Sequence, residues 1–172
     1  MNIKQLIEEV QSLPNCIVYP SVGVPTVQEG HELPEDIYQF YTLCGGISLF
    51  IDCDYEYHIV PPNNFVLANP VILGQKIFEE MAASNEYKNE ISMNWYIVVS
   101  DGNGDYLTID LDRKRLGRCY DSFHETHALI GDTPIIANSF GELLENLIKN
   151  RGNYPYWLKD DFISLGDAYD DI

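Results

Sequence analysis

Residues 95–111 constrain the fold of this chain more than any other stretch. Residues 95–99 (WYIVV) are apolar throughout and β-branched at three positions, which is typical of a central strand buried on both faces. Residues 106–111 alternate apolar and polar side chains, which predicts a strand with one buried face. Two glycines and an asparagine between these strands favour a tight reversal, so we expect an antiparallel hairpin.

The segments next to this hairpin extend the predicted core. A second turn at residues 112–114 lets residues 116–120 return as a third strand, which gives a β-meander. Trp95 is expected in the core, together with Phe40 and Tyr41. We expect the first turn to be structural and free of metal, and its residues are Asp101, Gly102, Asn103, Gly104 and Asp105.

Four stretches carry signals of amphipathic helices. In one, Pro34 suits the first helical position and Gly45 suits a left-handed helix end. In another, Ser139 and Glu142 form a capping box. The predicted helices lie within residues 3–13, 33–46, 75–88 and 139–152, and further strands are expected at 47–52 and 55–60.

The length and composition predict one α+β domain. A chain of 172 residues with 45% hydrophobic residues can bury a sizeable core without disulfides or structural metal ions. We place this domain at residues 1–152 and an acidic, aromatic extension at 153–172. The extension is too apolar for a free tail, so we expect it to dock on the domain through Trp157, Phe162 and Ile163.

Charge is the most informative part of the composition. Ten Lys and Arg against 27 Asp and Glu leave a formal charge of −17, and residues 5–75 hold nine acids with no Lys or Arg. Such a field repels nucleic acid and anionic membranes, and it attracts a basic protein. The alternative that acidity only keeps the protein soluble stays open.

The sequence predicts a cytoplasmic protein. The first residues lack the apolar core of a signal peptide, and no stretch has the roughly 18 apolar residues of a membrane span. Four scattered cysteines without a CxxC pair favour reduced, packed thiols.

The metal-binding and catalytic patterns are weak. Oxygen-bearing side chains at positions one, three, five and twelve of the 101–112 stretch invite a calcium hypothesis, but Tyr106 stands where that loop needs glycine. His124 and His127 are three residues apart, whereas a zinc-protease helix needs four. No nucleophile-elbow or phosphate-binding glycine pattern occurs, so we predict neither a cofactor nor catalytic residues.

Three motifs in a fixed order carry a family resemblance. They are residues 33–36 (LPED) followed by Gly45 and Gly46, Trp95 with the 101–105 turn (DGNGD), and residues 139–143 (SFGEL). In this order they resemble the SUKH superfamily, which includes bacterial immunity proteins and a fungal regulator of cell-wall glucan synthesis. The resemblance covers about residues 1–150, departs from the family pattern by a long insertion between Asn69 and Met93, and implies a curved antiparallel sheet packed against helices.

The resemblance also implies a function. It points to a non-enzymatic immunity protein (antitoxin) that binds and neutralises a cognate polymorphic toxin, often a nuclease, and the charge favours a basic toxin domain. Two alternatives stay open. One is a regulatory interaction module of the glucan-synthesis type without a toxin partner. The other is a carboxylate-dependent metal enzyme that uses Asp101, Asp105 and Asp110.

The predicted partner surface lies on the two strands within the acidic stretch. Successive side chains of a strand point to opposite faces, so acids at 52, 54 and 56 would share one face and tyrosines at 55 and 57 the other. Tyrosine offers a rigid ring with a polar tip for such contacts. The predicted partner-binding residues are Asp52, Asp54, Glu56, Tyr55, Tyr57, Glu35 and Asp36.

Overall fold

The computed structural model describes residues 1–170, which form a seven-stranded antiparallel sheet with helices, an α+β fold. Each strand pairs with the next one in the chain, so the predicted meander extends across the whole sheet and the predicted fold class is confirmed. The last two residues of the predicted extension, 171 and 172, lie outside the described residues. The strands are β1 (Ile17–Val18), β2 (Ile47–Leu49), β3 (Tyr57–Ile59), β4 (Trp95–Ser100), β5 (Tyr106–Asp110), β6 (Cys119–Ser122) and β7 (Ile135–Ala137).

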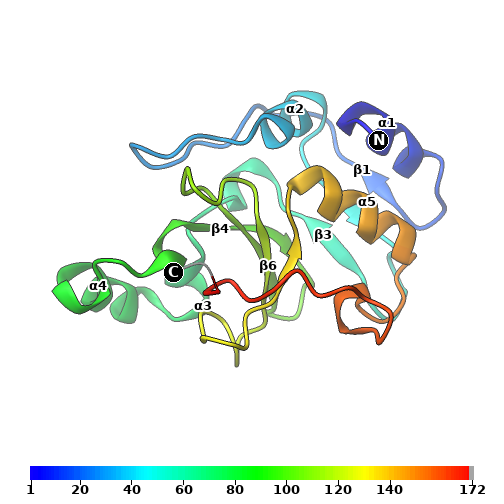
Figure 1. Cartoon of the computed structure of the whole chain (residues 1–172). Coiled ribbons are helices and arrows are strands. Elements are labelled where there is room, and N and C mark those ends of the chain that lie inside the picture. Colours follow the sequence, from blue (N-terminus) through cyan, green and yellow to red (C-terminus); the bar gives the residue numbers. More distant parts are fainter. Residues whose placement is uncertain (171–172) are drawn as a thin grey trace.

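Three helices gather at one end of the molecule and two lie at the other (Figure 1). α1, α2 and α5 contact one another, whereas α4 projects from the body beyond α3. No helix within residues 1–170 is long and apolar enough to cross a membrane. The α-helices are α1 (Ile3–Gln11), α2 (Glu35–Leu43), α3 (Ala68–Ile72), α4 (Gln75–Ala83) and α5 (Phe140–Asn150), and the short 3₁₀ turns are η1 (Pro62–Asn64), η2 (Asn85–Tyr87), η3 (Ile91–Asn94) and η4 (Tyr156–Leu158).

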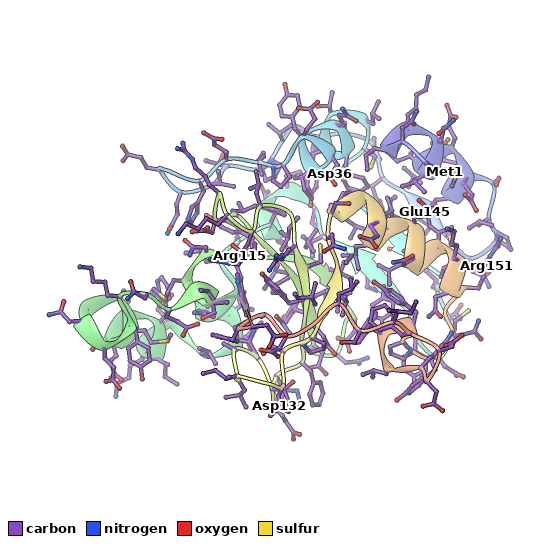
Figure 2. The ribbon with its side chains drawn as sticks, in the orientation of Figure 1. Met1, Asp36, Arg115, Asp132, Glu145 and Arg151 are labelled. Carbon is purple, nitrogen blue, oxygen red and sulfur yellow. The ribbon has the colours of Figure 1, made fainter. Side chains whose placement is uncertain are left out.

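Polar contacts connect the helix ends. The amino group of Met1 lies 3.1 Å from Oε2 of Glu145, which joins α1 to α5 (Figure 2). The backbone N–H of Gly141 in the first turn of α5 donates to Oδ2 of Asp36 at 2.8 Å, so a carboxylate from α2 satisfies an otherwise unpaired amide. Asp36 therefore holds two helices together.

Both ends of α2 differ from the prediction. Pro34 is the N-cap rather than the first helical residue, and the chain leaves the helix through Cys44 in an extended conformation. Gly45 does not adopt the left-handed conformation; Gly46 does, with φ 131°. A side chain at Gly45 would collide with the carbonyl oxygen of Pro20, so close packing is the reason for this glycine.

The strands within the acidic stretch are shorter than predicted. β2 ends at Leu49 and β3 begins at Tyr57, and the residues between them form a tight turn in which Phe50 and Asp52 have φ 54° and 68°. The prediction is therefore wrong at the C-terminal end of strand 47–52 and at the N-terminal end of strand 55–60. The third strand of the central meander, β6, begins at Cys119 rather than at residue 116.

The core lies between the sheet and the helices, and its largest fully buried side chains are aromatic. Trp95, Phe40 and Tyr41 are all fully buried, and the rings of Phe40 and Phe140 meet edge to face with centroids 4.9 Å apart. These contacts join α2 to α5 over the sheet.

The C-terminal extension lies against the edge of the sheet. The backbone N–H of Ile135 donates to Gly166 at 2.9 Å and that of Ala168 donates to Thr133 at 2.9 Å, so the extension partly pairs the free edge of β7. Trp157 is buried and Phe162 packs against the core, but Ile163 is 84% exposed, so its predicted burial is wrong.

Candidate functional site

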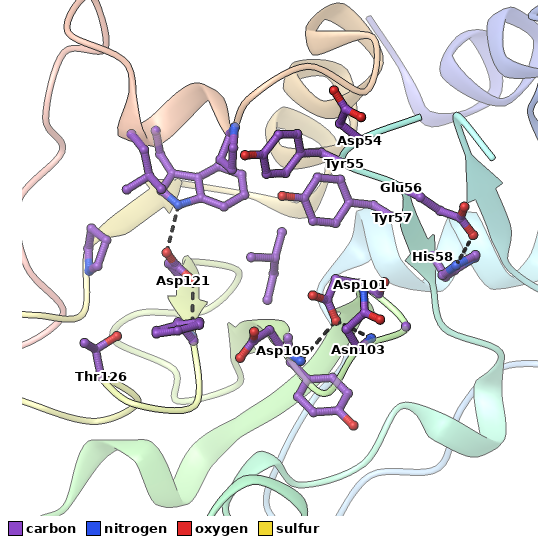
Figure 3. A pocket seen from close by; sticks show the side chains of 18 of the residues that line it. Asp54, Tyr55, Glu56, Tyr57, His58, Asp101, Asn103, Asp105, Asp121 and Thr126 are labelled. Carbon is purple, nitrogen blue, oxygen red and sulfur yellow. Dashed lines mark hydrogen bonds and ion pairs between the residues drawn. The ribbon is translucent and has the colours of Figure 1, made fainter. Parts of the chain in front are cut away.

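A cavity lies where three separate parts of the chain meet. Its volume is about 850 Å³. The β2–β3 turn, the β4–β5 turn with β5, and the 121–134 segment form its walls, and the extension closes the cavity on one side (Figure 3). Its lining combines carboxylates with aromatic rings. The shallow hollow on α2 also has a carboxylate and a ring, Glu35 and Tyr38, but its lining includes the cationic Lys4.

The β2–β3 turn places two tyrosines in the cavity. The backbone N–H of Asp52 donates to Oε2 of Glu56 at 3.1 Å, which closes the turn. Figure 3 shows the rings of Tyr55 and Tyr57 pointing into the cavity with Asp54 at its edge, while Glu56 turns toward His58. The predicted separation of acids and tyrosines onto two faces of a strand is therefore wrong, because residues 52–56 belong to the turn and only Tyr57 belongs to a strand, β3.

The β4–β5 turn supplies two carboxylates. Oδ1 of Asp101 accepts hydrogen bonds from the backbone N–H groups of Asn103 at 2.7 Å and Asp105 at 3.0 Å. Gly102 and Gly104 have φ 79° and 101°, which only glycine adopts without strain. The side chain of Asp101 thus replaces a backbone acceptor and holds the turn rigid at the mouth of the cavity.

Asp121 and Trp157 form the deeper wall. The indole Nε1 of Trp157 donates to Oδ2 of Asp121 at 2.8 Å, and the backbone N–H of Phe123 donates to Oδ1 at 3.2 Å. Burial raises the pKa of Asp121, these two hydrogen bonds oppose that rise, and the nearby charge of Asp105 adds to it. The ring of Tyr57 lies 6.2 Å from that of Trp157, so the two aromatics share this wall.

The cavity is strongly anionic. Among the described residues 1–170, six carboxylate side chains line it and no Lys or Arg does, so His58 is the one basic group of this lining. Nε2 of His58 lies 2.8 Å from Oε1 of Glu56, and Nδ1 of His58 shares a 2.9 Å hydrogen bond with the hydroxyl of Ser48. Just outside the lining, His124 lies 2.8 Å from Asp105, and this hydrogen bond raises the pKa of His124. The lining carboxylates are Asp54, Glu56, Asp101, Asp105, Asp121 and Asp132.

The structure divides the predicted partner-binding residues. Asp54, Tyr55, Glu56 and Tyr57 line the cavity, whereas Asp52 is exposed beside it without lining it. The remaining two lie at the start of α2: Glu35 accepts a bond from Gln39 at 2.9 Å, and Asp36 is engaged by Gly141. Of the tyrosines near strands, Tyr106 also lines the cavity, while Tyr96 and Tyr120 belong to the core.

Sequence reasoning missed half of the site. Asp121, Asp132, Phe123 and Trp157 were not predicted as site residues, although docking of Trp157 was expected. Asp121 and Trp157 are 36 residues apart, and no local pattern connects them. The one available signal was the surplus of aromatic residues in an otherwise acidic extension.

The arrangement is suited to binding cationic and aromatic groups. Carboxylates attract and orient a cation, and aromatic faces stack on it. Within residues 1–170, no group of three or more His, Cys, Asp or Glu side chains is placed to hold a metal ion. In the predicted turn 101–105, Oδ1 of Asp101 accepts two backbone hydrogen bonds and Oδ1 of Asp105 accepts one from the backbone N–H of His124.

Comparisons with known proteins agree with this fold. The profile of the SMI1/KNR4 family (SUKH-1) matches residues 28–146. The chain is 46% identical over its full 172 residues, and over 98% of the relative, to a protein of Bacillus subtilis (strain 168) named immunity protein YokJ. No solved structure gives a significant match. The chain belongs to the SMI1/KNR4 (SUKH-1) family.

Proposed function

We propose that the protein is an immunity protein that binds a cognate toxin directly and thereby neutralises it. The observation that carries this proposal is the 46% identity, over the whole chain, to a protein named as an immunity protein. The alignment extends beyond the 28–146 range of the family profile, so it covers the extension as well as the two turns that build the cavity. The role is that of a binding module without catalysis.

The charge of the molecule supports a basic partner. A formal charge of −17 accelerates encounter with a cationic protein, and the cavity concentrates six of the acids in one place. A nuclease domain, which carries a basic surface to bind nucleic acid, fits this description. We propose that the complex forms in the cytoplasm of the producing cell.

We place the centre of the interface at the cavity. Asp54, Tyr55, Glu56 and Tyr57 would contact the toxin, with exposed Asp52 at the rim of the same turn. Glu35 and Asp36 do not line the cavity, and Asp36 already binds α5, so we assign both to the fold. Aromatic anchors surrounded by charged rim residues are typical of protein interfaces.

Co-expression tests the proposal. The cognate toxin should arrest a heterologous host when expressed alone, and the host should survive when this protein is present. Size-exclusion chromatography of the two purified proteins should show a stable complex. Arrest despite abundant, folded protein would refute the immunity role and favour the regulatory alternative. Calorimetry with calcium, magnesium and zinc tests the metal-enzyme alternative separately.

A further inference from the structure

The carboxylates of the cavity lack cationic partners. Within residues 1–170, Asp54, Asp101, Asp121 and Asp132 make no ion pair, and the two other lining acids meet only histidines. The Arg and Lys side chains whose ion pairs are seen lie elsewhere, as Arg115 does with Asp110. The negative charge of the cavity is therefore not balanced from within the described chain.

Asp121 is the most costly of these charges. It lies deep beside Trp157 and its ionised form is disfavoured by burial and by Asp105. An unbalanced, partly buried carboxylate destabilises a fold, because it loses hydration without gaining an opposite charge. A cation that enters the cavity would remove this penalty at the moment of binding.

The walls add a preference for a flat cation. Tyr57 and Trp157 lie 6.2 Å apart between ring centroids with planes inclined by 46°, and both border Asp121. A guanidinium group is planar and weakly hydrated, so it can stack on such rings while its five N–H groups reach several carboxylate oxygens. An ammonium group is a compact, strongly hydrated charge and gains less from aromatic faces.

We infer that the cavity receives an arginine side chain from a loop of the partner protein, with the guanidinium packed against the small parts of the Tyr57 and Trp157 rings that remain accessible, 8% of each residue, and paired with Asp121, Asp105 and Asp101. The inference rests on the proposed function, because it names the group through which a toxin would anchor. The occupant is a protein side chain rather than a metal ion, because no three ligands converge within residues 1–170. A nucleic acid is excluded as occupant by the sign of the charge.

A peptide titration tests the inference without the toxin. The probe is the capped tripeptide acetyl-Gly-Arg-Gly-amide, and its citrulline counterpart has the same shape without the charge. The chain has two indole N–H groups: that of Trp157 borders the cavity and that of Trp95 is buried against Asp110, so Trp95 is an internal control. The arginine peptide should shift the Trp157 indole resonance and the amide resonances of residues 101–105 saturably, and leave Trp95 in place.

The controls make the result decisive. We expect the citrulline peptide to bind at least tenfold more weakly than the arginine peptide, and the lysine peptide acetyl-Gly-Lys-Gly-amide to bind at least threefold more weakly. Asp121→Asn should weaken arginine binding about tenfold. Because Asp121 also holds Trp157, the double variant Asp54→Asn/Asp132→Asn, at two exposed positions, provides a second test with a roughly threefold loss. The matched control Glu79→Gln/Glu80→Gln removes two charges from α4 and should change nothing.

Three outcomes would overturn the inference. Equal binding of the citrulline peptide, or shifts scattered away from the cavity, would show that it does not recognise the guanidinium. Binding of the lysine peptide as tight as that of the arginine peptide would refute the stacking argument. If the arginine peptide does not bind in the cavity while co-expression still protects the host, the arginine anchor is wrong and the immunity role stands. If the arginine peptide binds in the cavity but co-expression does not protect the host, only the immunity role is refuted.

Discussion

The indole Nε1 of Trp95 donates a 3.0 Å hydrogen bond to Oδ2 of Asp110, a carboxylate with no exposed surface at the centre of the sheet. The two residues face each other across β4 and β5. The same oxygen accepts from the hydroxyl of Tyr120 at 3.0 Å and from Nε of Arg115 at 2.8 Å. Burial raises the pKa of Asp110, and the charge and hydrogen bond of Arg115 act against that rise.

Removal of Arg115 should strongly destabilise the fold. Its side chain is only 12% exposed, so Arg115→Leu would leave the Asp110 charge buried without a counter-ion. The expected loss in the free energy of unfolding is about 3–5 kcal/mol, measured by urea denaturation. Arg113→Leu is the control, because Arg113 is 76% exposed and pairs with Glu32 at 3.1 Å, and its loss should be at most about 1 kcal/mol. Equal losses for both variants would contradict this account.

His127 should make the fold sensitive to acid. Its Nε2 lies 2.7 Å from Oδ1 of Asn69, and burial lowers its pKa to about 4 from the usual 6.5. The unfolded chain therefore binds a proton that the folded protein rejects, and stability is lost as the pH falls from 6.5 toward 4. The loss from this one residue amounts to roughly 3 kcal/mol.

A comparison of variants isolates this effect from the titration of the acids. The stability advantage of the natural protein over His127→Gln should shrink by that amount between pH 7 and pH 4. His124→Gln is the matched control. The bond to Asp105 raises the pKa of His124, so the stability of the natural protein relative to this variant should not fall between pH 7 and pH 4. An unchanged advantage for His127 over this range would show that its proton is accommodated in the fold.

The extension should contribute to stability through Trp157 rather than through Ile163. Trp157 is 8% exposed and contacts Asp121, whereas Ile163 is 84% exposed. Trp157→Ala should cost about 3–5 kcal/mol, and Ile163→Ala should stay within about 0.5 kcal/mol. Thermal unfolding measures both. If the Trp157→Ala variant unfolds at the same temperature as the natural protein, the extension is a free arm.

The central meander was predictable because its signals are local. The hairpin of residues 95–111 has its strand patterns and its turn residues within one short stretch, and the structure places β4 and β5 there. α3 was not predicted, because Pro70 reads as a break, although proline is tolerated in the first turn of a helix. The β2–β3 turn was missed because Phe50 and Asp52, not glycines, take the positive φ angles.

The site was predictable only in part, for a related reason. The acids and tyrosines at 54–57 were identified from charge and composition, but their arrangement depends on that unmarked turn. The opposite wall comes from residues 121–134 and 155–158, whose proximity is a result of tertiary packing. Sequence patterns describe periodicity within an element, and they carry no information on which distant segments enclose a cavity.

Single substitutions of Asp52 and Asp54 in the β2–β3 turn should differ in their effect on the rate of toxin association. Asp54 lines the cavity at an exposed position and makes no ion pair within residues 1–170, so its full charge is available to an approaching cation. Asp52 lies outside the lining in the same turn. We expect Asp54→Asn to slow association several-fold and to flatten its dependence on salt, whereas Asp52→Asn should change the rate less than twofold.

Stopped-flow mixing with the cognate toxin at several salt concentrations provides the measurement. Both variants remove one charge from exposed positions two residues apart, so the general attraction falls equally and any difference reflects the cavity. Folding should be unaffected, because exposed charges contribute little to stability. Identical rates and salt slopes for the two variants would mean that the acidity acts only through the net charge of the molecule, and the interface would then lie elsewhere.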